Sequence, residues 1–330
     1  MPIRAGDFFS GAGGSSSGAV AAGAEMAFGV DLWPLAAATY GDNFPSAHSI
    51  LASLSANGPL SFGHDPGPVD LLLASPECTH HTCARGARAR DEASRDTALY
   101  VLRFVRRLHP RWLVIENVVQ MRTWHRFGEL LAALRDEFGR HHVSIQTLDA
   151  GDFGVPQTRR RLFVICDRLR PPPVLARRPG LPTLEAVSIL DPPGTWSVRP
   201  LFSPRRAAAT LERAQRGIAA LGEGVPFLIV YYGSDGAGGW QRLDRPLRTL
   251  TTLDRFGLVE WHTGEPTLRM LQVPELRRAM GFPETFRLDR GTRRERIKLL
   301  GNAVCPPVMQ AIVEGLIADR ALTAPQVAAA

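Results

Sequence analysis

The chain has 330 residues, of which 45% are hydrophobic and 22% charged, and 39 Lys and Arg against 32 Asp and Glu give a formal net charge of +7. This composition excludes a wholly disordered chain, the length suits about two domains of roughly 150 residues, and no apolar run approaches the ~18 residues that a membrane helix needs. The four cysteines are too few for a disulfide scaffold and no secretory signal opens the chain, so we expect a cytoplasmic protein with free thiols, and the excess of arginine favours a polyanionic partner.

Up to about residue 167, short apolar runs alternate with stretches of helical spacing. The runs that predict strands are Ile3–Phe9, Met26–Val30, Val69–Ala74, Trp112–Ile115, Val143–Leu148 and Leu162–Cys166. Helices are predicted over Pro34–Phe44, Asp96–Leu108 and Phe127–Phe138, the first with proline in its first turn and the last ended by Gly139. This alternation predicts a doubly wound α/β sheet, and the unbroken apolarity of the strands predicts cover on both faces.

The pattern changes after residue 167. Residues 168–204 are rich in proline, which excludes another βα unit there. Phe227–His262 combines apolar runs with glycine turns and predicts strands, and helical spacing returns at Pro274–Met280, Arg293–Leu300 and Pro306–Ala318. We therefore expect a large domain of residues 1–170, a smaller domain of residues 171–293, and a C-terminal segment, residues 294–330, that returns to the large domain.

A glycine turn follows the first predicted strand, in Asp7-Phe-Phe-Ser-Gly-Ala-Gly-Gly14. Glycines at a strand-to-helix turn let backbone N–H groups approach a ligand at the helix N-terminus. Asp31 stands after the second strand, where a carboxylate accepts hydrogen bonds from ribose hydroxyls, and Leu32 follows it, where it would pack on an adenine. The glycine turn and Asp31 together indicate a cofactor site more strongly than either does alone.

Cys78 follows the third predicted strand, in Ser75-Pro-Glu-Cys-Thr-His-His-Thr-Cys-Ala-Arg85. Ligands of open α/β sheets bind at the carboxyl ends of parallel strands, so a thiol in this polar loop is a candidate nucleophile. Two alternatives stay open: a cysteine that only packs, and a metal site of Cys78, His80, His81 and Cys83, although adjacent histidines do not easily share one tetrahedral ion.

Glu116 ends the next parallel strand, so it emerges at the same edge of the sheet as Cys78. The apolar residues before it favour a carboxyl group with a raised pKa, and a helix-capping acid is the alternative interpretation. Further on, strand alternation places Arg159 and Arg161 on one face and Arg160 on the other.

Taken in order, these motifs resemble those of the C5-cytosine DNA methyltransferases that use S-adenosylmethionine, over nearly the whole chain. The resemblance implies a Rossmann-like methyltransferase sheet with a smaller target-recognition domain. It also implies transfer of a methyl group from S-adenosylmethionine to C5 of a flipped-out cytosine in double-stranded DNA, through a covalent Cys–C6 intermediate. Because Thr79–Arg95 is rich in arginine, it is the loop expected to close over that base.

The resemblance also assigns site residues. The catalytic set is Cys78 as the nucleophile of the Pro-Cys-Gln motif, Glu116 as the acid of the Glu-Asn-Val motif, and Arg159 and Arg161 of the Gln-x-Arg-x-Arg motif. The cofactor would be held by Phe9, Ser10, Gly11, Ala12, Gly13, Gly14, Asp31, Leu32, Pro76, Asn302 and Val304. DNA would be contacted by Thr79, Arg85, Arg88, Gln157, Thr249 and Thr251, and no resident metal is implied.

The chain departs from the family pattern beside the nucleophile. Glu77 stands where the family has proline and Thr79 where it has glutamine, while the aspartate expected to bind the adenine amino group has only Ser49 near its place. A carboxylate next to Cys78 would disfavour the thiolate unless an arginine pairs with that carboxylate. The arginine would come from the Arg85–Arg95 loop, or it would be Arg159. The alternative is that Glu77 points away from the pocket and caps a turn.

Two other functions stay open. One is a tRNA cytosine-5 methyltransferase on the same scaffold, although the Cys-Phe-Thr tripeptide expected of that branch is absent, and the other is a catalytically idle DNA-binding relative, suggested by Glu77 and Thr79. For the leading interpretation we expect a bacterial or phage-encoded monomer that binds double-stranded DNA and no membrane. Whether a cognate restriction endonuclease accompanies it is not specified by the sequence.

Overall fold

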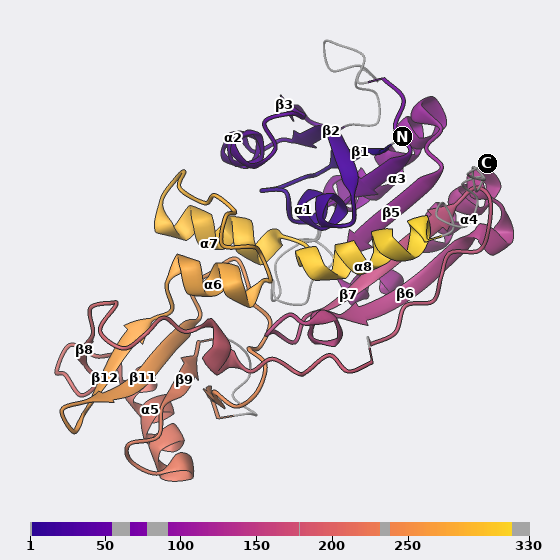
Figure 1. Ribbon diagram of the computed structural model, residues 1–330. Coiled ribbons are helices and arrows are strands. Elements are labelled where there is room, and N and C mark those ends of the chain that lie inside the picture. The colour runs from indigo at the N-terminus through magenta and orange to yellow at the C-terminus, as the bar shows by residue number, and fades with distance from the viewer. Residues whose placement is uncertain (1, 55–66, 78–91, 178, 232–237, 319–330) are drawn as a thin grey trace, which may run out of the picture.

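The computed structural model describes residues 2–54, 67–77, 92–177, 179–231 and 238–318. They form two sheets with helices α6 (Val273–Ala279) and α7 (Arg293–Asn302) between them (Figure 1). The larger sheet has seven strands in the order β3-β2-β1-β4-β5-β7-β6, and the smaller has five in the order β10-β9-β11-β12-β8. The α/β class predicted from the sequence is confirmed.

The large sheet is built mainly from parallel strands. Its members are β1 (Ile3–Phe8), β2 (Ala24–Asp31), β3 (His48–Leu51), β4 (Leu71–Ala74), β5 (Trp112–Asn117), β6 (Val143–Asp149) and β7 (Arg160–Asp167). The strands β1 to β5 pair in parallel, whereas β7 runs antiparallel to both β5 and β6. All six predicted strands are confirmed. The short strand β3 was not predicted, and neither was the reversed direction of β7.

Helices cover both faces of this sheet. They are α1 (Gly14–Ala21), α2 (Pro34–Asn43), α3 (Glu92–Leu108), α4 (Phe127–Phe138) and α8 (Pro306–Ile317). In β5, Trp112 and Val114 join the core on the side of α1 and α8, while Leu113 and Ile115 join the core on the side of α3 and α4. The unbroken apolar runs therefore have the cause predicted for them, since successive side chains enter opposite cores.

The C-terminal helices α7 and α8 belong to the core of the large domain. Arg293–Ile317 is long and apolar enough to cross a membrane by length and composition alone. However, Ala303 has extended backbone and divides the span into two helices, and 61% of the most apolar window is buried inside the protein. Such burial is typical of core helices, and α8 packs along α1.

The smaller sheet is entirely antiparallel. It comprises β8 (Arg199–Pro200), β9 (Phe227–Val230), β10 (Trp240–Arg242), β11 (Phe256–His262) and β12 (Glu265–Met270). The strands predicted within Phe227–His262 are confirmed. The sequence analysis missed α5 (Ala208–Leu221), which packs on β9 and β10. Sheet and helix both lie within the predicted small domain, residues 171–293.

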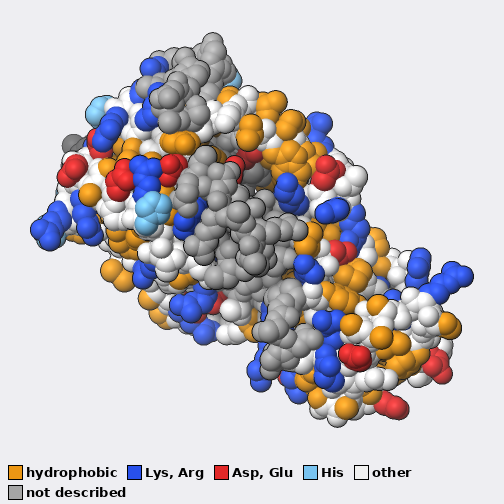
Figure 2. Space-filling model, turned by 180° about the vertical axis from the view of Figure 1, so that it is seen from behind, with side chains coloured by type: hydrophobic (Ala, Val, Ile, Leu, Met, Phe, Trp, Pro, Cys, Tyr) orange, Lys and Arg blue, Asp and Glu red, His pale blue; other side chains and the backbone are white. Residues whose placement is uncertain are grey.

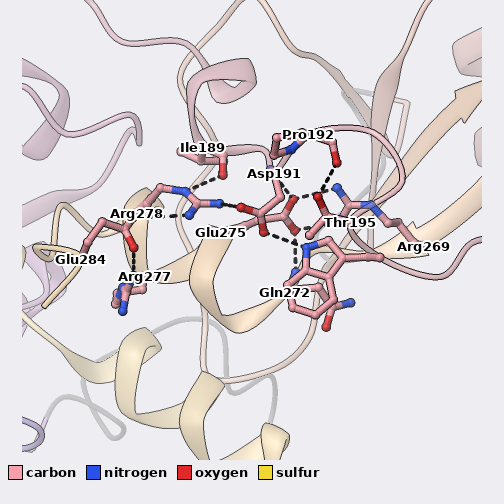
Figure 3. A network of polar contacts seen from close by, with 11 residues as sticks. Ile189, Asp191, Pro192, Thr195, Arg269, Gln272, Glu275, Arg277, Arg278 and Glu284 are labelled. Carbon is pink, nitrogen blue, oxygen red and sulfur yellow. Dashed lines mark hydrogen bonds and ion pairs between the residues drawn. The ribbon is translucent and has the colours of Figure 1, made fainter. Parts of the chain in front are cut away.

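A network of hydrogen bonds and ion pairs joins the proline-rich segment around Asp191 to α6 and β12 (Figure 3). Glu275 of α6 is fully buried, and its carboxylate pairs with Arg269 of β12 through bonds of 2.7 and 2.8 Å. The same carboxylate accepts a 3.0 Å hydrogen bond from the backbone N–H of Asp191, whose side chain pairs with Arg278 of α6. The network thus joins the proline-rich connection to the consecutive elements β12 and α6, which lie far from it in the sequence.

We expect Arg269→Met to destabilise the protein by about 3–5 kcal/mol, because it leaves the Glu275 charge buried without its partner. Urea unfolding of the whole chain measures the change. The control is Arg242→Met, since Arg242 forms a half-exposed pair with Asp244 and its loss should cost less than about 1 kcal/mol. Equal losses in the two variants would contradict the role of the network.

Candidate active site

The loops that follow β1, β2, β4 and β5 meet at one edge of the large sheet and surround a pocket of about 340 Å³. Nine of the predicted cofactor residues line it: Phe9, Ser10, Gly11, Gly14, Asp31, Leu32, Pro76, Asn302 and Val304. The other two lie in the same turn, where Ala12 is buried in the core and Gly13 is the N-cap of α1. The C-terminal segment supplies one wall of a pocket built otherwise by the first half of the chain.

The glycine turn has a backbone that only glycine adopts easily. Gly11 and Gly13 have φ angles of 54° and 101°, in the left-handed region. A Cβ atom on Gly14 would lie 2.3 Å from the carbonyl oxygen of Val304, so the turn and the C-terminal wall touch backbone to backbone. Phe9 also has a positive φ, 56°, which is strained for a residue with a side chain.

Asp31 is held by two backbone groups. Its Oδ2 accepts a 2.8 Å hydrogen bond from the N–H of Gly11, and its Oδ1 accepts one of 2.8 Å from the N–H of Trp33. Burial raises the pKa of this carboxyl, and the charge of Glu77 raises it further against the two backbone hydrogen bonds. Leu32 beside it is 61% exposed on the pocket wall.

Ser10 gives an independent sign that a polar ligand belongs in this pocket. Its hydroxyl oxygen is buried and has no hydrogen-bond partner within the part of the chain that the structure describes. A buried hydroxyl without a partner is costly, and Ser10 lies on the pocket wall where a ligand would satisfy it.

Asp7 lies beneath the glycine turn and is completely buried. The hydroxyl of Ser16 donates a 2.7 Å hydrogen bond to its Oδ2, and the same hydroxyl lies 3.1 Å from that of Tyr40. Burial raises the pKa of Asp7 to about 7. The hydrogen bond from Ser16 lowers this pKa, and the charge of Asp31 raises it by a smaller amount. The carboxyl group therefore holds a proton over much of the range in which an unfolded aspartate has lost it.

We expect Asp7→Asn to remove part of the pH dependence of stability. The folded state of the wild type keeps this proton up to about pH 7, whereas the unfolded state releases it near pH 4, so stability falls as the pH rises between these values. Between pH 4 and pH 8 the free energy of unfolding of the wild type should therefore fall by roughly 2–4 kcal/mol more than that of the variant. Urea unfolding at both pH values tests this, and parallel curves for the two proteins would contradict it.

Glu116 lies on the wall of the same pocket, at the end of β5. Burial raises the pKa of its carboxyl, while the positive charges of Arg161 and Arg159 lower it. The Nε atom of Arg161 lies 3.2 Å from Oε1 of Glu116, and the two side chains are only 17% and 9% exposed. This is a desolvated acid with its orientation fixed by one guanidinium, which suits proton donation.

Asn117 connects this acid to the loop that leads to Cys78. Its Nδ2 donates a 3.0 Å hydrogen bond to the carbonyl oxygen of Pro76, and its Oδ1 accepts one of 2.8 Å from the N–H of Val118. The sequence analysis did not single out Asn117. The Glu-Asn-Val motif itself carried the signal, because an amide after the acid can tie two neighbouring strand ends together.

Arg159 contacts the protein itself. It is 3% exposed, and its guanidinium donates hydrogen bonds to the carbonyl oxygens of Leu250, Gly301 and Ala303, at 2.9, 2.8 and 3.0 Å. Arg159 is buried and Arg161 partly buried, whereas Arg160 between them is exposed, which agrees with the alternation predicted from the sequence. The charge of Arg159 lowers the pKa of Glu116. The hydrogen bonds of Arg159 hold the segment around Leu250 and the C-terminal wall of the pocket at Gly301 and Ala303.

Gln157 is predicted to contact DNA, yet the structure buries it completely. Its Oε1 accepts a 2.8 Å hydrogen bond from the N–H of Leu250, and its Nε2 donates one of 2.8 Å to the carbonyl oxygen of Ala279. Both ends of the amide are therefore occupied by backbone, and the residue joins the two domains. The reason is that a buried amide must satisfy both of its polar ends, which a sequence motif does not reveal.

The two predicted threonines lie on the small-domain side. The hydroxyl of Thr249 donates a 2.7 Å hydrogen bond to the carbonyl oxygen of Thr158. The backbone of Thr251 packs closely on Gly301, and a Cβ atom on Gly301 would lie 2.3 Å from the carbonyl oxygen of Thr251. Both threonine side chains are partly exposed, so the structure leaves the predicted DNA contacts open.

Several predicted residues lie outside the described residues, namely Cys78, Thr79, Arg85 and Arg88, together with the His80, His81 and Cys83 of the metal alternative. Among the residues that the structure does describe, no group of three or more His, Cys, Asp and Glu is placed to hold a metal ion.

Two of the pocket residues that the sequence analysis did not predict, Trp33 and Lys298, contact one another. Trp33 lies on the wall after Asp31, and Lys298 of α7 holds its ammonium group 4.4 Å from the centre of the Trp33 ring. Lys298 is the only lysine of the chain. Its position depends on how α7 folds back, and local sequence does not specify that.

The family is shown by comparison with known proteins. Residues 3–175 and 239–318 match the sequence profile of the C-5 cytosine-specific DNA methylases, and the chain belongs to this family. It is 31% identical over 219 residues to the type II methyltransferase M.AgeI of Thalassovita gelatinovora, an alignment that covers 62% of this chain and 50% of that protein. The chain thus spans about half the length of this relative.

Other similarities extend further along the chain. The type II methyltransferase M.XorII of Xanthomonas oryzae pv. oryzae is 25% identical over 360 residues, which cover 94% of this chain and 83% of that protein. Among solved structures, the Entamoeba histolytica methyltransferase EhMeth superposes with a TM-score of 0.66 at 18% identity, over 97% of this chain and 99% of that one. The latter similarity bears on the fold.

Proposed function

We propose that the protein is a DNA cytosine-5 methyltransferase that transfers a methyl group from S-adenosylmethionine to C5 of a flipped-out cytosine in double-stranded DNA. The observation that carries this proposal is the position of Glu116, a buried acid on the wall of the pocket that the glycine turn and Asp31 surround. A cofactor site and a proton donor thereby share one cavity at the carboxyl edge of the sheet.

The residues present fit the cofactor. Asp31 is oriented to accept hydrogen bonds from ribose hydroxyls, and the glycine turn offers N–H groups at the start of α1 for the carboxylate of the methionine end. Ser10 has a buried hydroxyl that needs a partner, and Asn302 and Val304 complete the wall. When bound, S-adenosylmethionine supplies an electrophilic methyl group on a positively charged sulfur.

Glu116 would make the cytosine ring reactive. Its proton, which burial favours, would pass to N3 or be shared with it, while Arg161 holds the carboxyl group in place. The Cys78 thiolate would then add to C6, and C5 becomes nucleophilic enough to take the methyl group. Loss of the C5 proton and departure of the Cys78 sulfur from C6 restore the aromatic ring.

Basic side chains support DNA as the substrate. Figure 2 shows Lys and Arg side chains on both domains of the face in view. Where the small domain meets α7, Arg255 and Arg294 line a hollow of about 470 Å³, in which Arg293 is paired with Asp254. Arginines on such a surface neutralise phosphates, which dominate the affinity of proteins for DNA.

The setting of the protein is part of the proposal. The type II methyltransferase names of M.AgeI and M.XorII support a role in restriction–modification in a bacterial or phage context, and hence the cytoplasm, where the DNA is. A monomeric state and a cognate endonuclease remain expectations from the sequence.

We expect Glu116→Gln to reduce methylation at least a hundredfold while changing DNA affinity less than about threefold, because an amide hydrogen-bonds the base but supplies no proton. Transfer of tritium from labelled S-adenosylmethionine and gel-shift titration measure the two quantities. Glu129→Gln, an exposed acid on α4, is the matched control. Similar losses in both measurements would make Glu116 a structural residue.

We expect the wild type and Cys83→Ser, but not Cys78→Ser, to form a covalent adduct with double-stranded DNA containing 5-fluorocytosine in the presence of S-adenosylmethionine. Fluorine at C5 blocks the last elimination, so the enzyme stays attached and is detected by denaturing electrophoresis. An adduct through Cys83 would refute the assignment of the nucleophile. Methylation of tRNA in place of DNA, followed by mass spectrometry of nucleosides, would establish the tRNA alternative.

A further inference from the structure

Lys298 and Trp33 join two walls of the cofactor pocket that come from opposite ends of the chain. Trp33 follows Asp31 at the end of β2, whereas Lys298 lies on α7. The ammonium group of Lys298 lies 4.4 Å from the centre of the indole ring, and both side chains line the pocket. A cation at this distance from a ring centre is attracted by the negative face of the ring, and among aromatic side chains tryptophan attracts it most strongly.

The backbone of Trp33 in turn holds the carboxylate of Asp31. The N–H of Trp33 donates the 2.8 Å hydrogen bond to Oδ1, and Pro34 after it has no N–H that could replace this donor. The other oxygen, Oδ2, is held by the N–H of Gly11. The direction of the carboxylate therefore depends on where the backbone of Trp33 lies, and a fixed direction lowers the cost of binding a ribose.

Helix α2, which starts after this turn, is also held by the segment that leads into α7. At the end of the helix, the side chain of Asn43 exchanges hydrogen bonds of 2.8 and 2.9 Å with the backbone of Arg287. Near its start, Leu35 packs on Gly291, where a Cβ atom would lie 2.8 Å from the leucine side chain. These contacts hold the helix itself, whereas the contact between Lys298 and the indole holds the turn that enters it.

We propose that Lys298 is a positioning residue for the cofactor, because its ammonium group holds the indole of Trp33 and the backbone of Trp33 holds the carboxylate of Asp31 toward the ribose. The inference rests on the proposed function, since the ribose is that of S-adenosylmethionine. Lys298 acts here through a neighbouring side chain and not on the reacting atoms. Its charge therefore contributes to the affinity for the cofactor and not to the rate of methyl transfer once the cofactor is bound.

The test compares binding with turnover in the full chain. Lys298→Met keeps the apolar stem of the side chain and removes its charge. We expect it to raise both the Kd of S-adenosylhomocysteine, measured by isothermal titration, and the KM of S-adenosylmethionine about three- to fivefold, with kcat changed less than about twofold. Lys298→Arg keeps a cation for the indole ring and should restore both constants to within about twofold of the wild type.

A second set of measurements shows whether Lys298 acts through Trp33. In a chain that carries Trp33→Leu, the further change Lys298→Met should not weaken binding of S-adenosylhomocysteine any more. In the wild-type background, Lys298→Met should weaken binding of 5′-methylthioadenosine by the same factor, because this compound has the ribose but lacks the amino-acid end. Additive losses, or an unchanged affinity for 5′-methylthioadenosine, would mean that Lys298 binds the methionine carboxylate directly and would overturn the inference.

Arg107→Met is the matched control for net charge. It removes an exposed cation in the last turn of α3, outside the pocket, and should leave the Kd and the KM unchanged. Lys298→Met with wild-type constants, or with a loss in kcat as large as the rise in KM, would overturn the inference alone. Wild-type protein that binds neither S-adenosylmethionine nor S-adenosylhomocysteine would overturn the proposed cofactor as well.

Discussion

One buried guanidinium holds the C-terminal wall of the candidate active site in place. Arg159, just before β7, donates its hydrogen bonds to Leu250, on the return from the small domain, and to Gly301 and Ala303, at the break between α7 and α8. That break carries the residues that close the cofactor pocket. A buried charge is costly unless hydrogen bonds compensate it, and three carbonyl oxygens do so at the two terminal nitrogens of this guanidinium, so one group holds the segments together. Gln157 adds a second, neutral link to Leu250.

The same edge of the sheet concentrates acids that burial disfavours in their charged form. The pKa values of Asp7, Asp31 and Glu116 are all raised, in each case chiefly by burial. A fold selected only for stability would not place three carboxyl groups there, because each lowers the stability near neutral pH. Their presence indicates that the edge is built for binding and proton transfer, and the strained φ of Phe9 in the adjoining turn agrees with this.

The sequence predicted those features that depend on local pattern. Apolar runs identified six strands, and alternation correctly placed Arg159 and Arg161 on one side of the chain. Alternation predicts the side of a strand on which a side chain lies, but not the groups that the side chain contacts. Gln157 and Arg159 were therefore expected to contact the substrate, although in the structure they hydrogen-bond to backbone groups of the protein. The reversed direction of β7 depends on a short connection after β6, and Lys298 enters the pocket only because α7 packs back on the large domain. Neither property is local.

The internal segment that the family profile leaves unmatched, residues 176–238, is anchored within its first part and again beyond its end. At one end the carboxylate of Glu275 holds the backbone of Asp191, and beyond the other end Leu250 is bound by Gln157 and Arg159. Between the anchors lie α5 and the strands β8, β9 and β10, and side chains of α5 and β9 share a small core with Val259 of β11 and Leu268 of β12. Changes in that core do not need to move the pocket, because the chain is fixed before and after it. On the proposed function, the DNA sequence recognised can therefore vary while the chemistry at Glu116 stays the same.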